Sequence, residues 1–334
     1  MQAGIVGAGL IGRLLAWQLD RAGWRVTLFD KGGKDGRKSA AYAAAGMLSP
    51  LAECEISNRI IFDLGIYSLK QWPLWLSLLS QSVYFRQKGS IVIVHSRDKM
   101  EKEHWKKKIY HKIQVPYIKQ LSRSTLQQLE PELNFIEGYF LPQEAHLDSR
   151  ALLRALAKDL NVQWYEKTFV EEIIPYRVSI KGSQYSFDCV FDCRGVGASD
   201  RFDDLRSVRG ELIYIYAPDV NLNHPIRLLH PRYNVYIVPR PNHSYLIGSS
   251  EIESEDDSPI SVRTCLELLS AAYSIHPGFA EARILETVTA LRPALSDNLP
   301  RIHYEPGLIA INGLYRHGFL LAPAIVDEVM KRLK

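Results

Sequence analysis

The stretch Ala3-Gly4-Ile5-Val6-Gly7-Ala8-Gly9-Leu10-Ile11-Gly12, residues 3–12, decides the fold of this chain. It begins with a short apolar strand, continues through glycines with the spacing G-x-G-x-x-G, and leads into a helical stretch over 14–20. A second apolar strand, over 25–29, follows and ends at Asp30. Strand, glycine turn, helix, strand and terminal acid in this order are typical of a unit that binds a dinucleotide.

Each residue of this unit has a physical task in binding a dinucleotide. Gly7 permits the tight turn, Gly9 allows backbone N–H groups to approach a pyrophosphate, and Gly12 allows close packing of helix against strand. The helix N-terminus supplies partial positive charge to the phosphates, and Asp30 would accept hydrogen bonds from ribose hydroxyls. The glycines could also form a plain turn, but the flanking strands and Asp30 argue against that alternative. The pattern by itself does not separate FAD from NAD.

Two further glycine turns follow buried strands later in the chain. The apolar run 189–193 leads into Arg194-Gly195-Val196-Gly197, a second turn that we expect to face the dinucleotide. Near the C-terminus, the apolar run 308–311 leads through Asn312-Gly313 and Arg316-His317-Gly318 into a final helix. We therefore expect the nucleotide-binding domain to be assembled from the start, the middle and the end of the chain.

Length and composition limit the class of protein. With 334 residues, of which 46% are hydrophobic, the chain is long enough for two domains with large cores. No apolar run reaches the length of a membrane span, and a strand that starts at residue 3 leaves no room for a presequence. These features predict a reduced, cytoplasmic protein without membrane contact. The four cysteines, Cys54, Cys189, Cys193 and Cys265, lack the spacing of metal ligands, so we expect no metal site. Cys189 and Cys193 lie in or beside a predicted strand, where we expect buried thiols.

The net charge of +4 is mild, and the most basic stretch is 102–112, which contains Lys106-Lys107-Lys108. One interpretation is a nucleic-acid surface, in which the lysines contact phosphates and the interleaved aromatic side chains stack on bases. The alternative is an amphipathic helix with its lysines outward and with Trp105 and Ile109, at i and i+4, inward. One short run is not an electrostatic footprint, so we favour the helix and expect no nucleic-acid partner.

The segments between the glycine turns indicate a second, mainly antiparallel domain. Alternating apolar residues predict strands over 211–216, 234–239 and 243–249, followed by a helix over 262–274. The segment nearest to a flexible loop is 251–258, which contains five acids and two serines.

Earlier in the chain, the pattern over 56–79 is helical. We expect an interruption near Pro73, since proline cannot donate a hydrogen bond into a helix.

Longer motifs occur in a fixed order along the chain. They are Gly7–Gly12, Ala44-Ala45-Gly46-Met47-Leu48, Ala52-Glu53-Cys54-Glu55, Val208-Arg209-Gly210-Glu211, Tyr236-Ile237-Val238-Pro239-Arg240, Leu291-Arg292-Pro293 and Gly313-Leu314-Tyr315-Arg316-His317-Gly318-Phe319-Leu320-Leu321-Ala322-Pro323. Together they resemble the D-amino-acid oxidase superfamily of FAD enzymes, and most closely its glycine oxidase branch, which serves thiamin thiazole synthesis. The resemblance covers essentially the whole chain and favours FAD over NAD.

The resemblance implies an α/β fold of the α+β two-domain type. A Rossmann-like FAD-binding domain of the glutathione-reductase type carries an inserted, mainly antiparallel β substrate domain with helices. The implied boundaries are 1–83, 138–208 and 285–334 for the FAD-binding domain, and 84–137 and 209–284 for the substrate domain.

The resemblance, together with the glycine turns, implies noncovalent FAD, because the chain has no cysteine after Cys265 to tether a flavin. A helix that begins near Gly318 would direct its positive end at the flavin N1/O2 edge. Val170 matches a position that binds adenine through its backbone. The predicted FAD-binding residues are Gly7, Gly9, Leu10, Ile11, Gly12, Asp30, Lys31, Ser39, Ala40, Ala41, Ala45, Gly46, Met47, Val170, Gly195, Leu314, Tyr315, Arg316, His317, Gly318, Phe319 and Leu320.

On the substrate side, Arg292 fills the position that clamps the amino-acid carboxylate, Tyr236 lines the same pocket, and Arg316 lies near it. Arginine suits this role because its planar fork binds a carboxylate through two parallel hydrogen bonds. The chain departs from the family pattern at Ala290 and Leu314, where glycine and histidine are common. No residue is assigned as a catalytic acid or base.

The implied reaction is oxidation of glycine by hydride transfer to flavin N5. The imine then hydrolyses to glyoxylate and ammonia or supplies thiazole synthesis, and oxygen reoxidises the flavin to give peroxide. The resemblance also implies a homo-oligomer and a functional link to thiazole synthase. Alternatives are a D-amino-acid or sarcosine oxidase or dehydrogenase, a tRNA-modifying flavoprotein, and a non-catalytic nucleotide-binding protein.

Overall fold

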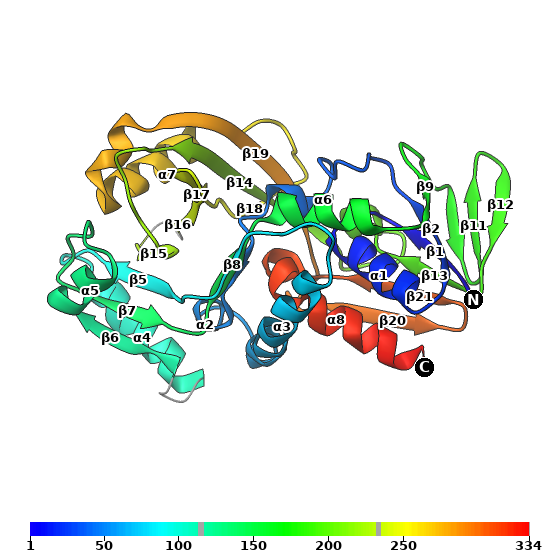
Figure 1. The fold of residues 1–334 in the computed structure, drawn as a ribbon, viewed down its shortest axis with the longest axis horizontal. Helices are drawn as coiled ribbons and strands as arrows, with labels where there is room; N and C mark the ends of the chain where they lie inside the picture. The colour runs from blue at the N-terminus through cyan, green and yellow to red at the C-terminus, as the bar shows by residue number, and fades with distance from the viewer. Residues whose placement is uncertain (113–116, 232–234, 334) are drawn as a thin grey trace.

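Segments from the start, middle and end of the chain lie side by side in one six-stranded sheet (Figure 1). The computed structural model describes residues 1–112, 117–231 and 235–333. In this sheet the outermost strand β20 is antiparallel to its neighbour and the other pairs are parallel. The strand order is β20 (Arg301–Glu305), β21 (Leu308–Asn312), β13 (Cys189–Asp192), β1 (Gln2–Val6), β2 (Arg25–Phe29) and β9 (Gln163–Tyr165).

The two faces of this sheet are covered differently, because side chains alternate along each strand. Ile5 belongs to the apolar core shared with the helices, whereas its neighbour Val6 packs on the other face. The helical side consists of α1 (Leu10–Arg21), α3 (Arg59–Ser77), α6 (Ser149–Asp159) and α8 (Gly318–Arg332). The other side is covered by the antiparallel strands β10 (Glu172–Ile174), β11 (Arg177–Ile180) and β12 (Ser183–Ser186).

A nine-stranded sheet forms the other half of the molecule, on the left in Figure 1. Its pairs are antiparallel except β15 with β5, and β19 (Arg283–Ala294) pairs with β14 outside the main path. Its strand order is β18 (Ile252–Glu253), β14 (Arg206–Tyr216), β17 (Ser244–Gly248), β16 (Val235–Arg240), β15 (Ile226–Leu229), β5 (Ser90–Val94), β7 (Glu137–Leu141) and β6 (Lys119–Ser122). This mixed α/β architecture confirms the predicted fold class.

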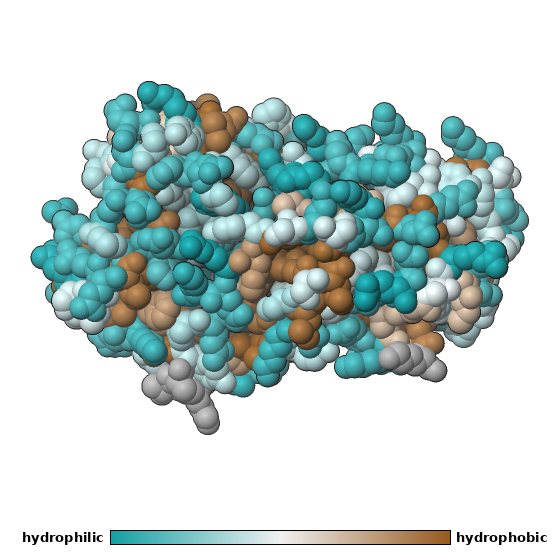
Figure 2. Space-filling model, viewed as in Figure 1, coloured by the Kyte–Doolittle hydropathy of each residue, from teal (hydrophilic) through white to brown (hydrophobic). Residues whose placement is uncertain are grey.

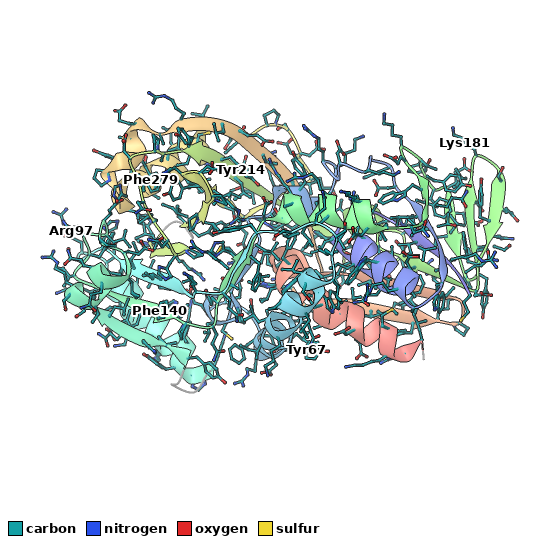
Figure 3. The ribbon with its side chains drawn as sticks, in the orientation of Figure 1. Tyr67, Arg97, Phe140, Lys181, Tyr214 and Phe279 are labelled. Atoms are coloured by element: carbon teal, nitrogen blue, oxygen red, sulfur yellow. The ribbon has the colours of Figure 1, made fainter. Side chains whose placement is uncertain are left out.

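Shorter elements join the two sheets and pack on their faces. Figure 3 shows the length of the molecule, from Arg97 beyond β5 to Lys181 in the turn between β11 and β12. The remaining helices are η1 (Ala40–Ala43), α2 (Pro50–Glu53), α4 (Lys99–Lys112), α5 (Arg123–Leu129), η3 (Gly195–Gly197), α7 (Val262–Ile275), η4 (Pro277–Glu281) and η5 (Tyr315–His317). Besides the sheet formed by β10, β11 and β12, a second three-stranded sheet has the order β3 (Met47–Leu48), β8 (Ala145–Leu147) and β4 (Phe85–Arg86).

Two predictions for single helices have different outcomes. Trp105 and Ile109 are buried on α4, which confirms the predicted inward face. The outward position of the lysines holds only in part, because Lys107 is exposed whereas Lys112 donates to the carbonyl oxygen of Cys54. The predicted interruption near Pro73 is wrong, because α3 continues through this residue. Packing compensates for the missing backbone hydrogen bond: Trp72 is fully buried and its indole N–H donates to the carbonyl oxygen of Phe319 at 3.0 Å. Tertiary contacts here outweigh the local preference of proline.

The described surface is polar over most of the face seen in Figure 2. Apolar side chains gather near the centre of that face, over α3, and Leu74 and Leu78 at the C-terminal end of this helix are exposed. None of the helices in the described ranges combines the length and apolar character needed to cross a membrane. The four cysteines are free thiols, and burial raises the pKa of Cys54 and Cys189 to about 11.

The predicted domain boundaries stay predictions, although the strand order agrees with an assembly from three separate parts of the chain. Residues 113–116, 232–234 and 334, which belong to the predicted segments 84–137, 209–284 and 285–334, lie outside the described residues. The predicted strand 234–239 is therefore described from Val235 onward, as β16.

Candidate functional site

A cavity of about 660 Å³ lies between the six-stranded and nine-stranded sheets. Most of the predicted FAD-binding residues line it, although they come from distant parts of the chain. Gly12 and Val170 do not line the cavity. Gly12 lies against the backbone of Gly7, and Val170 is buried in the apolar cluster between the six-stranded sheet and β10–β12. The predicted residues that line the cavity are Gly7, Gly9, Leu10, Ile11, Asp30, Lys31, Ser39, Ala40, Ala41, Ala45, Gly46, Met47, Gly195 and Leu314–Leu320.

The glycine turn between β1 and α1 has no space for a side chain at Gly7 or Gly12. Gly7 has a φ of +101°, and a Cβ on it would lie 2.4 Å from the carbonyl oxygen of Cys193. A Cβ on Gly12 would lie 1.8 Å from the carbonyl oxygen of Gly7. No side chain caps the N-terminus of α1, so its first backbone N–H groups are available at the cavity wall. This arrangement fits the phosphates of a dinucleotide.

Asp30 stabilises the same turn. One carboxylate oxygen accepts a hydrogen bond from Ala8 N–H and the other from Gly32 N–H, both at 2.6 Å. An ionised carboxylate has about four acceptor sites, so Asp30 retains capacity for ribose hydroxyls.

Arg13 is a buried residue of this site that the sequence analysis missed. Its guanidinium donates to the carbonyl oxygens of Ala8 at 2.7 Å, Leu153 at 2.9 Å and Lys34 at 3.0 Å. It thereby connects the glycine turn with the segment 31–38, much of which lines the cavity. Burial lowers the pKa of Arg13, but arginine stays charged near neutral pH. A basic residue directly after Gly12, inside an apolar helical stretch, is the signal that could have indicated it.

At the other end of the cavity, Arg292 on β19 is a partly buried cation without an acidic partner among the described residues. Its guanidinium donates to Ser249 Oγ and to the carbonyl oxygen of Ser250, both at 3.0 Å. Among the described residues, no carboxylate oxygen lies within 4.0 Å of its guanidinium nitrogens. Burial lowers its pKa. A partly buried guanidinium that lines a cavity and has no carboxylate partner is suited to bind a carboxylate from solution.

Two strand glycines make room for the predicted substrate residues, and the sequence analysis assigned no role to either. A Cβ on Gly210 of β14 would lie 2.2 Å from Nη2 of Arg292. A Cβ on Gly248 of β17 would lie 2.7 Å from the hydroxyl oxygen of Tyr236 on β16, which also lines the cavity. Glycine inside a strand is the general signal of such close approach, but it does not identify the neighbour.

Arg316 differs from Arg292 because two acids hold it. Its Nε lies 2.9 Å from Glu53 Oε2, and its Nη1 lies 2.8 Å from Glu251 Oε2. Burial by itself would lower the pKa of Arg316, but the charges of Glu53 and Glu251 raise it. Burial by itself would raise the pKa of Glu53, but the positive charge of the Arg316 guanidinium outweighs burial and lowers this pKa to about 2. Glu53 and Arg316 are therefore both charged near neutral pH.

His317 lies beside this cluster without carrying a charge. Its Nε2 is 3.2 Å from Ser57 Oγ, and its Nδ1 is 3.3 Å from Glu53 Oε2. Burial lowers the pKa of His317 to about 4, so the imidazole is neutral near neutral pH and is a weak base.

A second cavity, of about 550 Å³, adjoins the first. Four residues line both cavities, namely Ser249, Glu251, Tyr315 and His317. Glu251 accepts hydrogen bonds from the hydroxyl of Tyr315 and from Arg316. The contact of Glu251 with residues 315 and 316 thus lies at the boundary between the two cavities.

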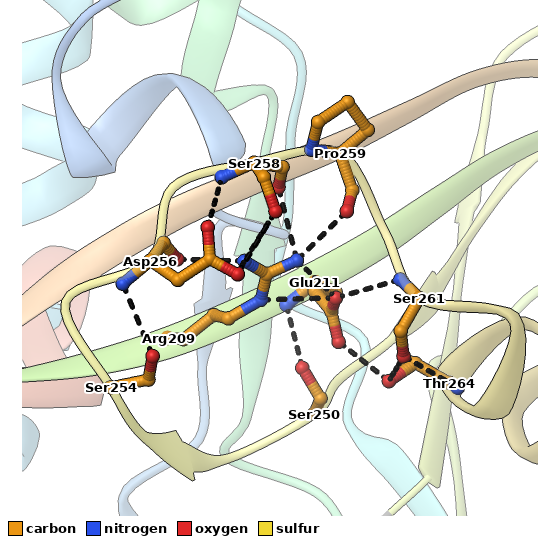
Figure 4. Close-up of polar contacts among 9 residues, drawn as sticks. All are labelled: Arg209, Glu211, Ser250, Ser254, Asp256, Ser258, Pro259, Ser261 and Thr264. Carbon is orange, nitrogen blue, oxygen red and sulfur yellow. Dashed lines mark hydrogen bonds and ion pairs between the residues drawn. The ribbon is translucent and has the colours of Figure 1, made fainter.

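The acidic segment 251–258 is attached to the nine-stranded sheet by Arg209, which is buried (Figure 4). Its guanidinium binds Asp256 through an ion pair at 2.8 Å and donates to the carbonyl oxygens of Ser258 and Pro259. Glu211 holds Arg209 from the other side at 2.7 Å. The sequence analysis treated this segment as the nearest to a flexible loop, whereas strand β18 and Arg209 fix both of its ends.

The chain is similar to known proteins over almost its whole length. The family model described as FAD dependent oxidoreductase (DAO) matches residues 2–332. The chain is 39% identical over 330 residues to a protein named thiamine biosynthesis oxidoreductase ThiO from Rhizobium etli, covering 98% of this chain and 94% of the relative. It is 26% identical to the bifunctional protein ThiO/ThiG of Trichormus variabilis, with 96% of this chain aligned to 50% of that longer protein.

The fold is similar to that of solved structures. The glycine oxidase of Geobacillus kaustophilus superimposes with a TM-score of 0.86 at 24% identity, covering 98% of this chain and 93% of that one. At this identity the likeness supports the fold.

Proposed function

The chain belongs to the DAO family of FAD dependent oxidoreductases, and on this premise we propose that it oxidises glycine with oxygen as the electron acceptor. FAD is its cofactor. The observation that carries the substrate class is Arg292, a partly buried cation that lines the cavity and has no acidic partner among the described residues. The names of the relatives, glycine oxidase and ThiO, support glycine and a place in thiamine biosynthesis.

The residues of the larger cavity fit FAD. Side chains in place of Gly7 and Gly12 would collide with nearby backbone. The N-termini of α1 and α8 have no side-chain cap, so they offer backbone donors at two places along the cavity. We assign the adenosine diphosphate half to the residues around Gly9 and Asp30, and the flavin to 45–47 and 314–320. When bound, FAD accepts a hydride from the carbon next to the amine.

The chain itself binds and orients the amino acid. Arg292 would hold the carboxylate through two parallel hydrogen bonds, and Tyr236 would limit the space beside it. Arg316 belongs to the same wall, but its charge is already balanced by Glu53 and Glu251. No side chain is assigned to proton transfer: His317 is neutral and a weak base, with its Nε2 beside Ser57. Positioning rather than acid–base chemistry is therefore the contribution that we assign to the protein.

The product imine would hydrolyse to glyoxylate and ammonia, or pass to thiazole synthesis. The second route is supported by the relative in which a ThiO part and a ThiG part share one chain. A link to a thiazole synthase and a homo-oligomeric assembly remain part of this proposal.

An anaerobic absorption spectrum before and after addition of glycine tests the proposed reaction. We expect a yellow protein whose oxidised-flavin band bleaches with glycine and returns with air. Bleaching by D-alanine or sarcosine in place of glycine would keep the reaction class and change the substrate. Absence of bleaching with all three would refute the proposal.

The Arg292→Ala variant tests the assigned clamp. Loss of one partner of a buried charge pair costs about 2–5 kcal/mol, so kcat/KM for glycine should fall by about thirtyfold or more while FAD stays bound. Arg177→Ala, in the exposed hairpin of β11 and β12, removes an arginine far from the cavity and serves as the matched control. Normal glycine oxidation by the Arg292 variant would show that the assignment is wrong.

A further inference from the structure

The two arginines of the substrate wall differ in what holds them. Arg292 binds Ser249 and Ser250, which are uncharged, whereas Arg316 is paired with Glu53 and Glu251. Before a substrate binds, this part of the cavity wall therefore carries two positive charges and two negative charges. They belong to Arg292, Arg316, Glu53 and Glu251. An amino acid with one carboxylate and one ammonium group adds no net charge to this balance. A substrate with a second carboxylate adds one negative charge.

Arg227 offers no free partner for that second carboxylate, and Arg263 is an exposed cation that lines the second cavity beyond Glu251. Arg227 also lines the larger cavity, but its Nη2 lies 3.0 Å from Glu55 Oε2 and its Nη1 donates to the carbonyl oxygen of Ala52 at 2.7 Å. Asp257 adds a further acid to the lining. Glu53 forms an ion pair with Nε of Arg316 and accepts a hydrogen bond from Nη2. Glu251 accepts the hydrogen bond from the remaining nitrogen, Nη1.

Space for a larger substrate exists on the far side of Glu251. The second cavity, of about 550 Å³, is much larger than a carboxymethyl group, and Glu251 lines both cavities. Of the four residues that line both cavities, Glu251 is the one with an acidic side chain, so a substrate that extends into the second cavity passes beside a carboxylate. The Glu251 side chain is 45% exposed, so it can be replaced without opening an apolar core.

We propose that Glu251 is a specificity-determining residue that restricts the site to amino acids with one carboxylate. It occupies Nη1 of Arg316, the edge that a second carboxylate would need, and it places a negative charge at the entrance to the second cavity. Like charges brought together in this way discriminate strongly against a wrong ligand. Removal of the Glu251 charge replaces an ionic partner of Nη1 by at most a neutral acceptor, which a second carboxylate can displace, and raises the net charge of the site by one. The inference rests on the proposed function, because it takes Arg292 as the clamp for the first carboxylate.

Binding of two unreactive ligands tests this assignment without relying on catalysis. Methoxyacetate has one carboxylate, and diglycolate is the same ether with a second one, so the pair differs in the group under test. Neither contains an amine that the protein could oxidise. Their dissociation constants would be measured by titration calorimetry on the purified FAD-containing protein, at fixed ionic strength. We expect the wild type to bind methoxyacetate at least about tenfold more tightly than diglycolate.

The Glu251→Gln variant should lose this preference. We expect its affinity for diglycolate to rise by about tenfold or more, with the affinity for methoxyacetate little changed. Glu255→Gln is the matched control, because it removes the same charge from the same loop at an exposed position that lines neither cavity. The control should keep the wild-type preference.

The outcomes separate this inference from the proposed function. Equal binding of both ligands by the wild type, or the same behaviour of the Glu251 and Glu255 variants, would overturn the role of Glu251 and leave the Arg292 clamp intact. Failure of the wild type to bind methoxyacetate at all would refute the clamp, and this inference with it. The comparison of the two ligands on the wild type stays decisive even when a variant fails to fold.

Discussion

Gly210→Ala is the substitution that tests the geometry of the substrate wall most directly, because it removes no chemical group. The added carbon would lie 2.2 Å from Nη2 and 2.3 Å from Cζ of Arg292, whereas ordinary contacts begin at 3.4 Å. The guanidinium must therefore move away by about 1.2 Å, and its hydrogen bonds to Ser249 and Ser250 must lengthen. Misplacement of a binding group by about 1 Å costs about a hundredfold in rate, which equals about 2.7 kcal/mol.

The assay is steady-state release of peroxide from glycine, with FAD content and thermal unfolding measured on the same preparation. We expect kcat/KM to fall by about a hundredfold, mainly through KM, with FAD retained. Gly197→Ala is the control, because its added carbon would meet Arg194 Cβ at 3.6 Å, an ordinary contact. A Gly210→Ala protein with kcat/KM within about threefold of the wild type would refute the placement of Arg292 described above.

Two further predictions concern the cofactor end and the protein interior. Asp30→Ala removes the acceptor of Ala8 N–H and Gly32 N–H, so we expect FAD affinity to fall by about tenfold or more in an equilibrium titration of the apoprotein; unchanged affinity would contradict this. Burial raises the pKa of Glu144 from 4.5 to about 7, so the folded state holds a proton there that the unfolded state loses. The stability of the wild type relative to Glu144→Gln should therefore decrease as pH rises from about 4.5 to 7, by at most about 3 kcal/mol, in denaturant titrations; a pH-independent difference would contradict the assignment.

The cofactor half of the site was predictable because its signals are local. The glycine spacing and the apolar strands on either side of it lie within 30 residues, and backbone geometry dictates what such a segment can bind. The strand order that brings the middle and the end of the chain to β1 follows from the same glycine turns. The local preference of proline to interrupt a helix did not predict the structure at Pro73. There the buried Trp72 and its hydrogen bond to the carbonyl oxygen of Phe319 stabilise α3 through tertiary contacts.

The substrate half depends on pairings that no local pattern contains. Gly210 matters because β14 and β19 pair in a register that brings it beside Arg292, and those strands are separated by more than sixty residues. Gly248 lies opposite Tyr236 for the same reason. Sequence composition shows that these positions are glycines inside strands, but register decides which side chain each one accommodates.

The acidic segment after β17 is largely an exposed loop, as its charge pattern predicts, but that pattern does not indicate which residues the segment contacts. Five acids in eight residues are typical of a solvated loop, and the apolar pattern offers no contrary signal. In the structure, Ser249 and Ser250 hold Arg292 while Glu251 holds Arg316, so one short stretch of backbone fixes both arginines. Arg209 in turn holds the outer part of that stretch to the sheet. Because both arginines depend on the same backbone, a change in the conformation of this loop would alter carboxylate binding at Arg292 and charge selection at Arg316 together.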